Sequence, residues 1–188
     1  LTNAQCAAML GSGDIGLVNF VGSSRGGLEV RQAAASQLVN EIFELGGKDA
    51  AYVRPDANLE VTASELVRAA FTNSGQSCCS VERIYVADAV YDRFVDLFVD
   101  AASAWRIGHP VDNDFELGPV INAAAAQRIE NEVAQAIQSG ARELLARPMP
   151  KLANASAYVA PKILVDVDHS MSIMRSETFG PVAPIMRV

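Results

Sequence analysis

Two adjacent cysteines, Cys78 and Cys79, lie between a Gly-containing turn and an apolar, β-branched run in the stretch FTNSGQSCCSVERIYV, residues 71–86. Such a pair could form a disulfide, bind a metal ion or provide an activated thiol nucleophile. A disulfide is the poorest of the three, because neighbouring residues rarely satisfy the geometry of the bond. The third cysteine, Cys6, makes the count odd, which favours free thiols and a reducing compartment.

A metal site would need more ligands than the sequence brings together. Zinc takes about four ligands, usually in paired spacings. The chain offers two adjacent cysteines, one distant cysteine and two isolated histidines, His109 and His169. Each histidine lies in a segment typical of a protein surface. We therefore predict no metal site.

A nucleophilic cysteine needs surroundings that favour the thiolate, because a free thiol has a pKa of about 8.5. Residues 73–77, Asn-Ser-Gly-Gln-Ser, can form a turn whose backbone N–H groups provide such surroundings. The alternative is a buried structural cysteine, since cysteine is among the residues most often buried. The thiols and the turn alone favour this alternative.

Two glycine-containing segments could bind phosphate. Residues 11–16, GSGDIG, match the dinucleotide pattern G-x-G-x-x-G. However, a predicted helix precedes them and a predicted strand follows, which reverses the order that the pattern requires. We interpret them as a turn. Gly22-Ser23-Ser24 instead follows a predicted strand and opens a helix, so Gly22 would allow close backbone approach and Ser23 could donate to a phosphate oxygen.

The hydrophobic pattern predicts the elements that must position these residues. Strands are expected at residues 17–21, 41–45, 49–53, 83–86, within 158–167, and at the C-terminal end. Helices are expected at residues 3–10, 25–38, 59–70, from 88 to 105, and from 122 to 140. Pro161 should stand at a strand start or edge, and residues 108–119 should form a loop. This alternation predicts an α/β fold with a largely parallel sheet.

Two helices have a predicted inward face. Along the fourth helix, the apolar residues at helical spacing are Val90, Phe94, Phe98, Ala101 and Trp105. Along the fifth, they are Ile129, Val133 and Ile137. Both sets should pack against the sheet.

Composition limits the classes of function. The 188 residues are half hydrophobic and one-fifth charged, with a net charge of −7. That charge argues against nucleic-acid binding, which requires a basic face. No apolar run approaches the length of a membrane span. The opening LTNAQCAAML has neither an initiator Met nor a basic leader, so we interpret the chain as an internal segment of a longer protein. We expect a cytoplasmic protein, with the mitochondrial matrix as an alternative location.

Four motifs, in order and at fitting distances, resemble those of the aldehyde dehydrogenase superfamily. FTNSGQSCCSVER fits the active-site signature F-x-N-x-G-Q-x-C-x-x-x-x-R, and FELGGK, residues 43–48, resembles the general-base motif. ETFGP, residues 177–181, is similar to the segment that meets the nicotinamide ribose. FVGSSRGG, residues 20–27, resembles the cofactor-phosphate turn, although Val21 replaces the usual Thr. Glu44 precedes Cys78 by 34 positions, which fits the family.

This resemblance implies an aldehyde dehydrogenase-like catalytic domain, with a parallel sheet flanked by helices, and the last part of a Rossmann-like cofactor domain. Residues 1–44 would complete the NAD(P)-binding domain, and residues 45–188 would form an incomplete catalytic domain. The whole protein would be a homodimer or homotetramer that acts on a small aldehyde. Binding of nucleic acid or membrane is not expected.

The resemblance also implies roles for two catalytic residues. Cys78 would attack the aldehyde, and the resulting thiohemiacetal would pass a hydride to NAD or NADP and become a thioester. Glu44 would activate the water that hydrolyses this thioester. Transfer of the acyl group to coenzyme A is an alternative that would make Glu44 dispensable. Cys79 would not be needed for the chemistry.

Five residues would contact the cofactor. The resemblance places Gly22 and Ser23 at its phosphates, Glu177 at ribose hydroxyls, Phe179 at the nicotinamide end, and Leu45 nearby. Lys48 would help to fix the Gly-Gly turn, and Arg83 would tie the nucleophile loop to its strand.

One partner in catalysis is missing from the chain. The second donor to the oxyanion would be an Asn upstream, so we expect the 188 residues alone to show little or no activity. The competing hypothesis is a non-catalytic remnant or isolated domain that only binds a ligand or a partner chain.

Overall fold

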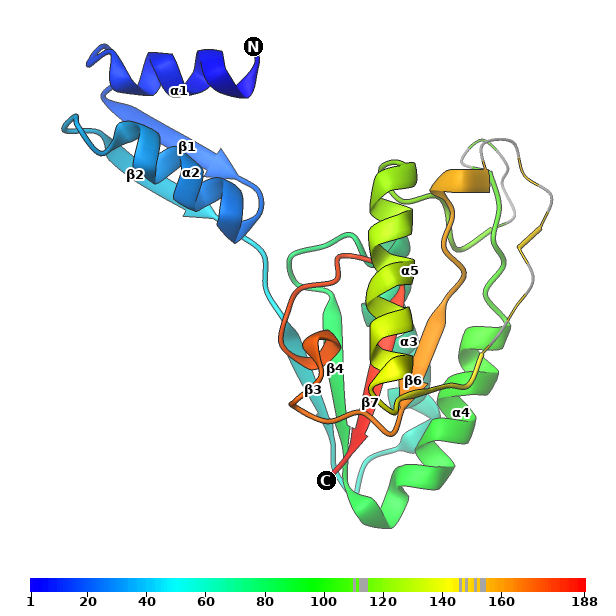
Figure 1. Cartoon of the computed structure of the whole chain (residues 1–188). Coiled ribbons are helices and arrows are strands. Elements are labelled where there is room, and N and C mark those ends of the chain that lie inside the picture. Colours follow the sequence, from blue (N-terminus) through cyan, green and yellow to red (C-terminus); the bar gives the residue numbers. More distant parts are fainter. Residues whose placement is uncertain (110, 112–114, 146, 148, 151, 153–154) are drawn as a thin grey trace. The chain divides into compact units, whose positions relative to one another are not determined.

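The computed structural model describes residues 1–109, 111, 115–145, 147, 149–150, 152 and 155–188 (Figure 1). Part of the predicted loop 108–119 lies outside these residues. The chain divides into two compact units, Leu1–Gly46 and Gly47–Val188. Each unit is described by itself.

The first unit contains a parallel βαβ element preceded by one helix. Its elements are α1 (Asn3–Gly11), β1 (Leu17–Val21), α2 (Ser24–Ala34) and β2 (Asn40–Glu44). Strands β1 and β2 pair in parallel, with Val21 opposite Glu44. Helix α2 ends at Ala34, four residues before the predicted end at Leu38, where short backbone turns at Ala35 and Gln37 lead into β2.

Residues 11–16 join a helix to a strand, as predicted. Helix α1 ends at Gly11, and β1 begins at Leu17. Between them, Gly13 has a φ of 86°, in the left-handed region that glycine adopts without steric cost. The order helix, turn, strand is therefore the reverse of a dinucleotide-binding turn.

The second unit is built on a five-stranded sheet in the order β3-β4-β7-β6-β5. Its strands are β3 (Asp49–Val53), β4 (Val81–Val86), β5 (Arg142–Glu143), β6 (Lys162–Val165) and β7 (Val182–Arg187). All pairs are parallel except β5 with β6. Strand β6 begins directly after Pro161, as predicted, because proline cannot donate to the ladder. The predicted α/β class with a largely parallel sheet is confirmed.

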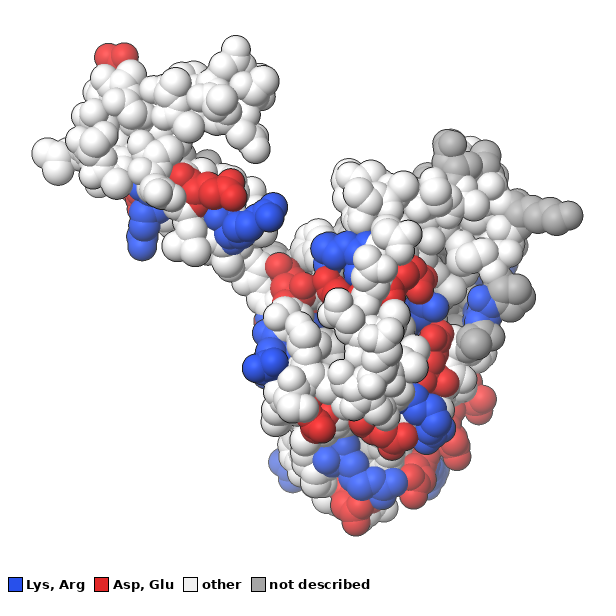
Figure 2. All heavy atoms as spheres, viewed as in Figure 1, with Lys and Arg blue, Asp and Glu red and all other residues white. Residues whose placement is uncertain are grey.

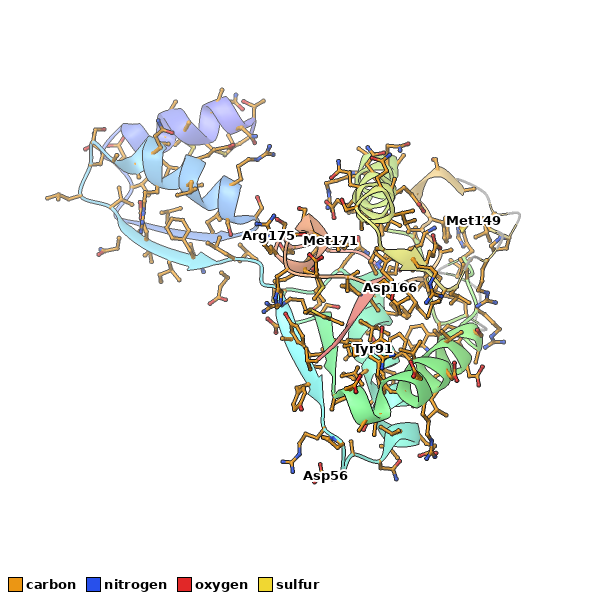
Figure 3. The ribbon with its side chains drawn as sticks, turned by 60° about the horizontal axis from the view of Figure 1, so that its bottom comes forward. Asp56, Tyr91, Met149, Asp166, Met171 and Arg175 are labelled. Atoms are coloured by element: carbon orange, nitrogen blue, oxygen red, sulfur yellow. The ribbon has the colours of Figure 1, made fainter. Side chains whose placement is uncertain are left out.

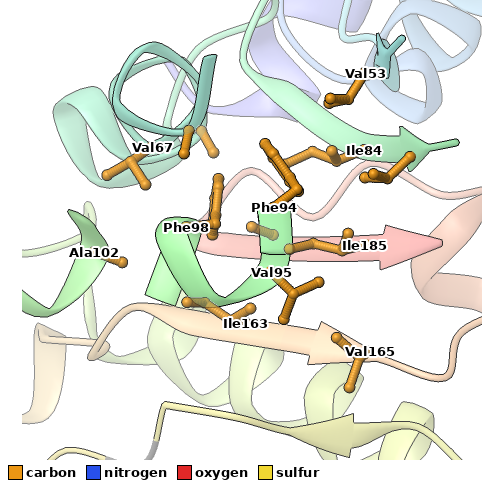
Figure 4. Close-up of a cluster of buried hydrophobic side chains, with 14 of the residues drawn as sticks. Val53, Val67, Ile84, Phe94, Val95, Phe98, Ala102, Ile163, Val165 and Ile185 are labelled. Carbon is orange, nitrogen blue, oxygen red and sulfur yellow. The ribbon is translucent and has the colours of Figure 1, made fainter. Parts of the chain in front are cut away.

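Helices cover both faces of this sheet. The α-helices are α3 (Leu59–Phe71), α4 (Tyr91–Ser103) and α5 (Ala123–Gln138), and the short 3₁₀ turns are Thr72–Gly75, Asp88–Val90, Ala155–Ala157 and Ser172–Met174. On one face, Phe94 and Phe98 of α4 pack with Val67 of α3 against Ile84 and Ile185 (Figure 4). Burial of such a side chain contributes about 1.5–3 kcal/mol.

The opposite face of the sheet is covered by α5. Ile129 and Val133 pack with Leu164 and Met174 in a second buried cluster. The predicted inward position of Ile137 is wrong, because its side chain is 43% exposed. Ala136 takes that place, since positions 129, 133 and 136 keep the spacing i, i+4, i+7 of one helix face.

The start and end of α4 also differ from prediction. A 3₁₀ turn occupies Asp88–Val90, so the α-helix begins at Tyr91. The Tyr91 hydroxyl donates to the Ile185 carbonyl at 3.3 Å and attaches the helix to β7 (Figure 3). At the other end Ala102 is fully buried, whereas Trp105 lies beyond the helix.

Charged side chains are mixed on the surface of the second unit. On the face shown in Figure 2, basic and acidic residues alternate over this unit, while the first unit is mostly uncharged. None of the helices in the described ranges combines the length and apolar character that a bilayer-spanning helix needs.

Candidate active site

The cysteine pair follows a strained turn at the end of α3. Asn73, Ser74 and Gly75 have φ values of 54°, 57° and 70°, three successive residues in the left-handed region. The Asn73 amide donates to the Gln76 carbonyl, and the Gln76 amide donates to the Asn73 carbonyl, each at 3.0 Å. Non-glycine residues in this region cost about 1–3 kcal/mol each and are concentrated at functional sites. The side-chain bonds hold this turn in one conformation.

The turn is attached to two distant segments. A Cβ atom on Gly75 would lie 2.1 Å from the Gly180 carbonyl oxygen, so only glycine allows the turn to contact the ETFGP segment. On the other side, the Ser74 hydroxyl donates to Gly118 at 2.8 Å. The Ile121 N–H donates to the Gln76 side chain at 2.8 Å. These contacts explain why the signature contains Gly75 and Gln76.

Cys78 and Cys79 are free and exposed thiols. The Cys79 sulfur lies 3.2 Å from the Ser77 hydroxyl oxygen. A Cβ atom on Gly47 would come within 2.9 Å of the Cys78 carbonyl oxygen, so the backbone of the GGK segment lies against the cysteine turn. Cys78 is therefore not a buried structural cysteine, which was the alternative, and a reagent can reach it.

Glu82 connects three of the motifs. Its side chain is 3% exposed, and it accepts hydrogen bonds from Lys48 Nζ at 2.7 Å and from the N–H groups of Thr178 and Phe179 at 2.7 and 2.8 Å. One buried carboxylate therefore links β4, the GGK segment and the ETFGP segment. Hydrogen bonds to a charged acceptor are the stronger kind, and removal of one partner leaves the others unsatisfied.

Lys48 is buried beside this carboxylate. Burial lowers the pKa of the Lys48 ammonium, and the ion pair with Glu82 opposes that effect. Its Nζ also lies 3.3 Å from the Thr178 hydroxyl. Lys48 thus fixes the ETFGP segment as well as the Gly-Gly turn.

Arg83 was predicted to tie the nucleophile loop to its strand, but the structure shows a different contact. Its Nε donates instead to the Lys48 carbonyl at 2.8 Å, which joins β4 to the residue that precedes β3. The long side chain of Arg83 follows the neighbouring parallel strand rather than the loop at its own strand's start. Its role is to hold the GGK segment in place.

Glu177 and Phe179 lie on the ETFGP segment. The Gly47 N–H donates to a Glu177 carboxylate oxygen at 3.3 Å. Burial raises the pKa of Glu177, and this hydrogen bond partly offsets the increase. Phe179 has a φ of 50° and is 38% exposed, so its ring is available for a contact.

The remaining predicted site residues lie in the first unit. Ser23 caps α2, where its hydroxyl oxygen accepts the Gly26 N–H at 3.1 Å. The Gly22 N–H donates to the Glu44 carbonyl at 3.0 Å, which joins the phosphate turn to the end of β2. Leu45 packs against Gly27, where an added Cβ would lie 3.0 Å from a Leu45 methyl group. Glu44 is exposed at the last position of its strand.

A cavity of about 710 Å³ adjoins this turn within the first unit. Ser23 and Gly26 line it at the start of α2, and Leu10, Val18 and Val30 contribute apolar side chains. The N-terminus of a helix presents free N–H groups that suit an anion. Among the described residues, no group of three or more His, Cys, Asp or Glu could hold a metal ion.

A family model for the aldehyde dehydrogenases matches residues 3–188. The chain belongs to the aldehyde dehydrogenase family. Lactaldehyde dehydrogenase of Escherichia coli K12 is 39% identical to it over 179 residues, which are 95% of this chain and 37% of that enzyme. This chain therefore spans about 37% of the length of that relative.

Solved structures of aldehyde dehydrogenases agree with the fold. An NADP-dependent glyceraldehyde-3-phosphate dehydrogenase from Bacillus halodurans, complexed with NADP, has a TM-score of 0.87 at 32% identity, covering 97% of this chain and 37% of that one. A betaine aldehyde dehydrogenase from Staphylococcus aureus, in complex with NAD+, has a TM-score of 0.91 at 28% identity, covering 97% and 36%. The predicted aldehyde dehydrogenase-like fold is confirmed.

Glu82 is the residue of this aldehyde dehydrogenase site that the motifs missed, and its replacement should destabilise the second unit. Glu82→Ala leaves the Lys48 ammonium and two N–H groups buried without their acceptor. We expect a loss of about 3–5 kcal/mol in the free energy of unfolding, measured by urea denaturation of the 188-residue chain. Glu60→Ala, which removes the exposed partner of Arg93, should cost only a small fraction of this. Equal stability of the two variants would contradict the assigned role of Glu82.

Proposed function

We propose that the protein containing this chain oxidises an aldehyde to a carboxylic acid with NAD+ or NADP+. The observation that carries the proposal is the exposed, free thiol of Cys78 on a turn that contacts both the GGK and the ETFGP segments. Cys78 is the nucleophile. Its thiolate attacks the aldehyde carbon, and the oxyanion of the resulting thiohemiacetal accepts a hydrogen bond from the Cys78 N–H.

We propose that the dinucleotide binds mainly through the first unit, as the last part of a cofactor domain. Gly22 and Ser23 would contact a phosphate at the start of α2, and the adjoining cavity has room for the adenosine. Leu45 lies next to this turn through its contact with Gly27. The charge and the shape of the helix N-terminus both fit an anionic group.

The second unit, as part of the catalytic domain, would hold the nicotinamide end. When bound, the nicotinamide supplies a hydride acceptor. The Glu177 carboxylate would accept hydrogen bonds from ribose hydroxyls, and the Phe179 ring would pack against the nicotinamide end. The bond from Gly47 to Glu177 orients that carboxylate. Loss of a hydride converts the thiohemiacetal on Cys78 to a thioester.

Glu44 would activate the water that hydrolyses the thioester. It lies three positions before Gly47, so covalent geometry keeps the two Cα atoms within about 11 Å of each other. Gly47 itself lies against the Cys78 carbonyl. A carboxylate is a competent general base when it is positioned on water near the reacting carbon.

The assembly and location of the whole protein are also proposals. We propose a homodimer or homotetramer, as the resemblance implies. A reducing compartment, the cytoplasm or the mitochondrial matrix, suits three exposed thiols that form no disulfide, Cys6, Cys78 and Cys79.

A coupled assay tests the proposed function. The full-length protein should reduce NAD+ or NADP+ when an aldehyde is added, and carboxylic acid should form in equal amount. The measurement is nicotinamide absorbance together with chromatography of the product. An absence of turnover over a panel of short, long and aromatic aldehydes, with both cofactors, would support a non-catalytic binding protein instead.

A further inference from the structure

A second cavity, of about 430 Å³, opens beside the cysteine turn in the second unit. It lies between the last turns of α3 and residues 73–80, and Cys79 is in its wall. Cys79 follows Cys78 in the chain, so the wall contains the residue next to the proposed nucleophile, while Cys78 itself is not part of that wall. If the proposed function holds, this cavity is where the part of the aldehyde beyond its carbonyl group lies.

Most of the side chains that line this cavity carry a polar group. Its side chains include the hydroxyl of Thr72, the amides of Asn73 and Gln76, and the hydroxyl of Ser77, and Ala69 is the hydrocarbon side chain among its described residues. A long alkyl chain or an aromatic ring would cover these polar groups without replacing their hydrogen bonds to water, which is unfavourable. These groups offer hydrogen-bond partners to a polar group of a substrate.

Among the described residues, this wall contains one cation, Arg68, and one anion, Glu65. Its Nε lies 3.5 Å from a Glu65 carboxylate oxygen, and both side chains are about two-thirds exposed, at 69% and 66%. Exposed pairs of this kind hold their partners weakly. A guanidinium can exchange such a partner for a carboxylate that it binds with two parallel hydrogen bonds.

The backbone of Arg68 is held by a hydrogen bond at the end of its helix. Its backbone carbonyl accepts a hydrogen bond from the Thr72 hydroxyl at 2.7 Å. Arg68 and Thr72 both line this cavity and also a neighbouring hollow of about 560 Å³. The Arg68 backbone is therefore held by a helical turn. A long, flexible loop would place the charge less accurately.

We propose that this cavity selects short aldehydes with an acidic group at the far end, and that Arg68 binds this group. Arg68 is thus a specificity-determining residue. The proposal rests on the proposed function for the aldehyde, but the affinity of Arg68 for anions beside the cysteines can be measured without turnover.

The first test compares iodoacetate with iodoacetamide, which are similar in size and differ in charge. In the 188-residue chain, each reagent alkylates exposed thiols, and peptide mass mapping gives the rates at Cys6, Cys78 and Cys79. Arg68→Gln should lower the iodoacetate-to-iodoacetamide rate ratio at Cys78 and Cys79 by about threefold to tenfold at low salt. The ratio at Cys6, in the other unit, should not change, and Arg68→Lys should keep most of the wild-type ratio.

The matched control is Arg54→Gln. Arg54 is as exposed as Arg68 and pairs with Asp56 in the turn between β3 and α3 (Figure 3), so its loss changes the net charge equally. It should leave all three ratios unchanged. Equal ratios at Cys78 and Cys79 in wild type and Arg68→Gln, or equal losses in the Arg54 variant, would overturn the proposal.

The second test uses substrates with the full-length protein. Succinic semialdehyde carries a carboxylate, and pentanal is of similar length without one. Arg68→Gln should lower kcat/KM for succinic semialdehyde at least tenfold more than for pentanal. Equal losses for the two aldehydes would overturn the proposed substrate class. If wild type oxidises neither aldehyde nor any other, the proposed function fails, and the alkylation ratios still decide whether Arg68 attracts an anion.

Discussion

Replacement of Cys78 by alanine is expected to lower aldehyde oxidation by the full-length protein by at least about four orders of magnitude. Without the sulfur there is no thiohemiacetal, and a free aldehyde is a poor hydride donor. Cys78 is exposed, and its turn is held mainly by Asn73, Ser74 and Gln76, so the variant should fold normally. The measurement is the steady-state rate of nicotinamide reduction at saturating aldehyde.

Cys79→Ser is the matched control for this variant. It removes the neighbouring thiol, keeps the size of the side chain, and should retain activity within about tenfold of wild type, because the proposed chemistry uses only the sulfur of Cys78. If activity instead disappears with Cys79 and survives loss of Cys78, the nucleophile has been assigned to the wrong cysteine.

Glu44→Gln is expected to slow the steady state by about two to three orders of magnitude and to leave the first turnover nearly intact. The thiolate attack and the hydride transfer do not need a base acting on water, whereas thioester hydrolysis does. Stopped-flow absorbance should therefore show a burst of reduced nicotinamide, close to one equivalent per active site, followed by a slow phase. Added hydroxylamine should restore turnover, because it cleaves thioesters without general-base help.

Glu41→Gln provides the control on the same strand. Its carboxylate pairs with Arg31 Nε at 2.9 Å on the other side of β2, so it should affect neither the burst nor the slow phase. An unchanged steady state in Glu44→Gln would contradict the role of Glu44. Acyl transfer to a thiol acceptor would be favoured if turnover of this variant required added coenzyme A.

The sequence predicted most of the fold because local signals agree with tertiary packing. Residues 17–21 and 49–53 form strands with the expected bounds, since apolar runs there end at Gly and Pro. Asn122 caps α5, where its side chain accepts the Ala125 N–H at 2.8 Å. Ile137 was misplaced because spacings of three and four residues both continue a helix face, and only the position of the sheet decides between them.

Long-range contacts explain what was missed in the site. Glu82 looks like an ordinary charged residue, and its partners Lys48 and Thr178 lie 34 and 96 positions away in the sequence. One signal was present in the sequence. Glu82 alternates in register with the apolar residues Ile84 and Val86, and the structure shows that these three positions of β4 are the buried ones. A carboxylate at an apolar position of a strand predicts a buried polar network.

The sequence motifs identified the candidate catalytic residues, but they did not predict the long-range contacts that hold those residues in place. Gly75 and Gln76 were identified as letters of a signature, but the reason for each is a contact with a segment more than forty positions away, at Gly180 and Ile121. The direction of the Arg83 side chain could not be predicted either, because it depends on which strand lies beside β4. Parallel pairing with β3 supplies its acceptor, the Lys48 carbonyl.

The most direct test of the proposed mechanism is to locate the acyl group on the protein. Full-length Glu44→Gln protein is mixed with one aldehyde and the oxidised cofactor, quenched in acid, and digested for tandem mass spectrometry. We predict an acyl group on the peptide that holds both cysteines, with the fragment masses placing it on the sulfur of Cys78. An acyl group on Cys79, or complete turnovers that leave neither sulfur modified, would contradict the central claim that a thioester forms on Cys78.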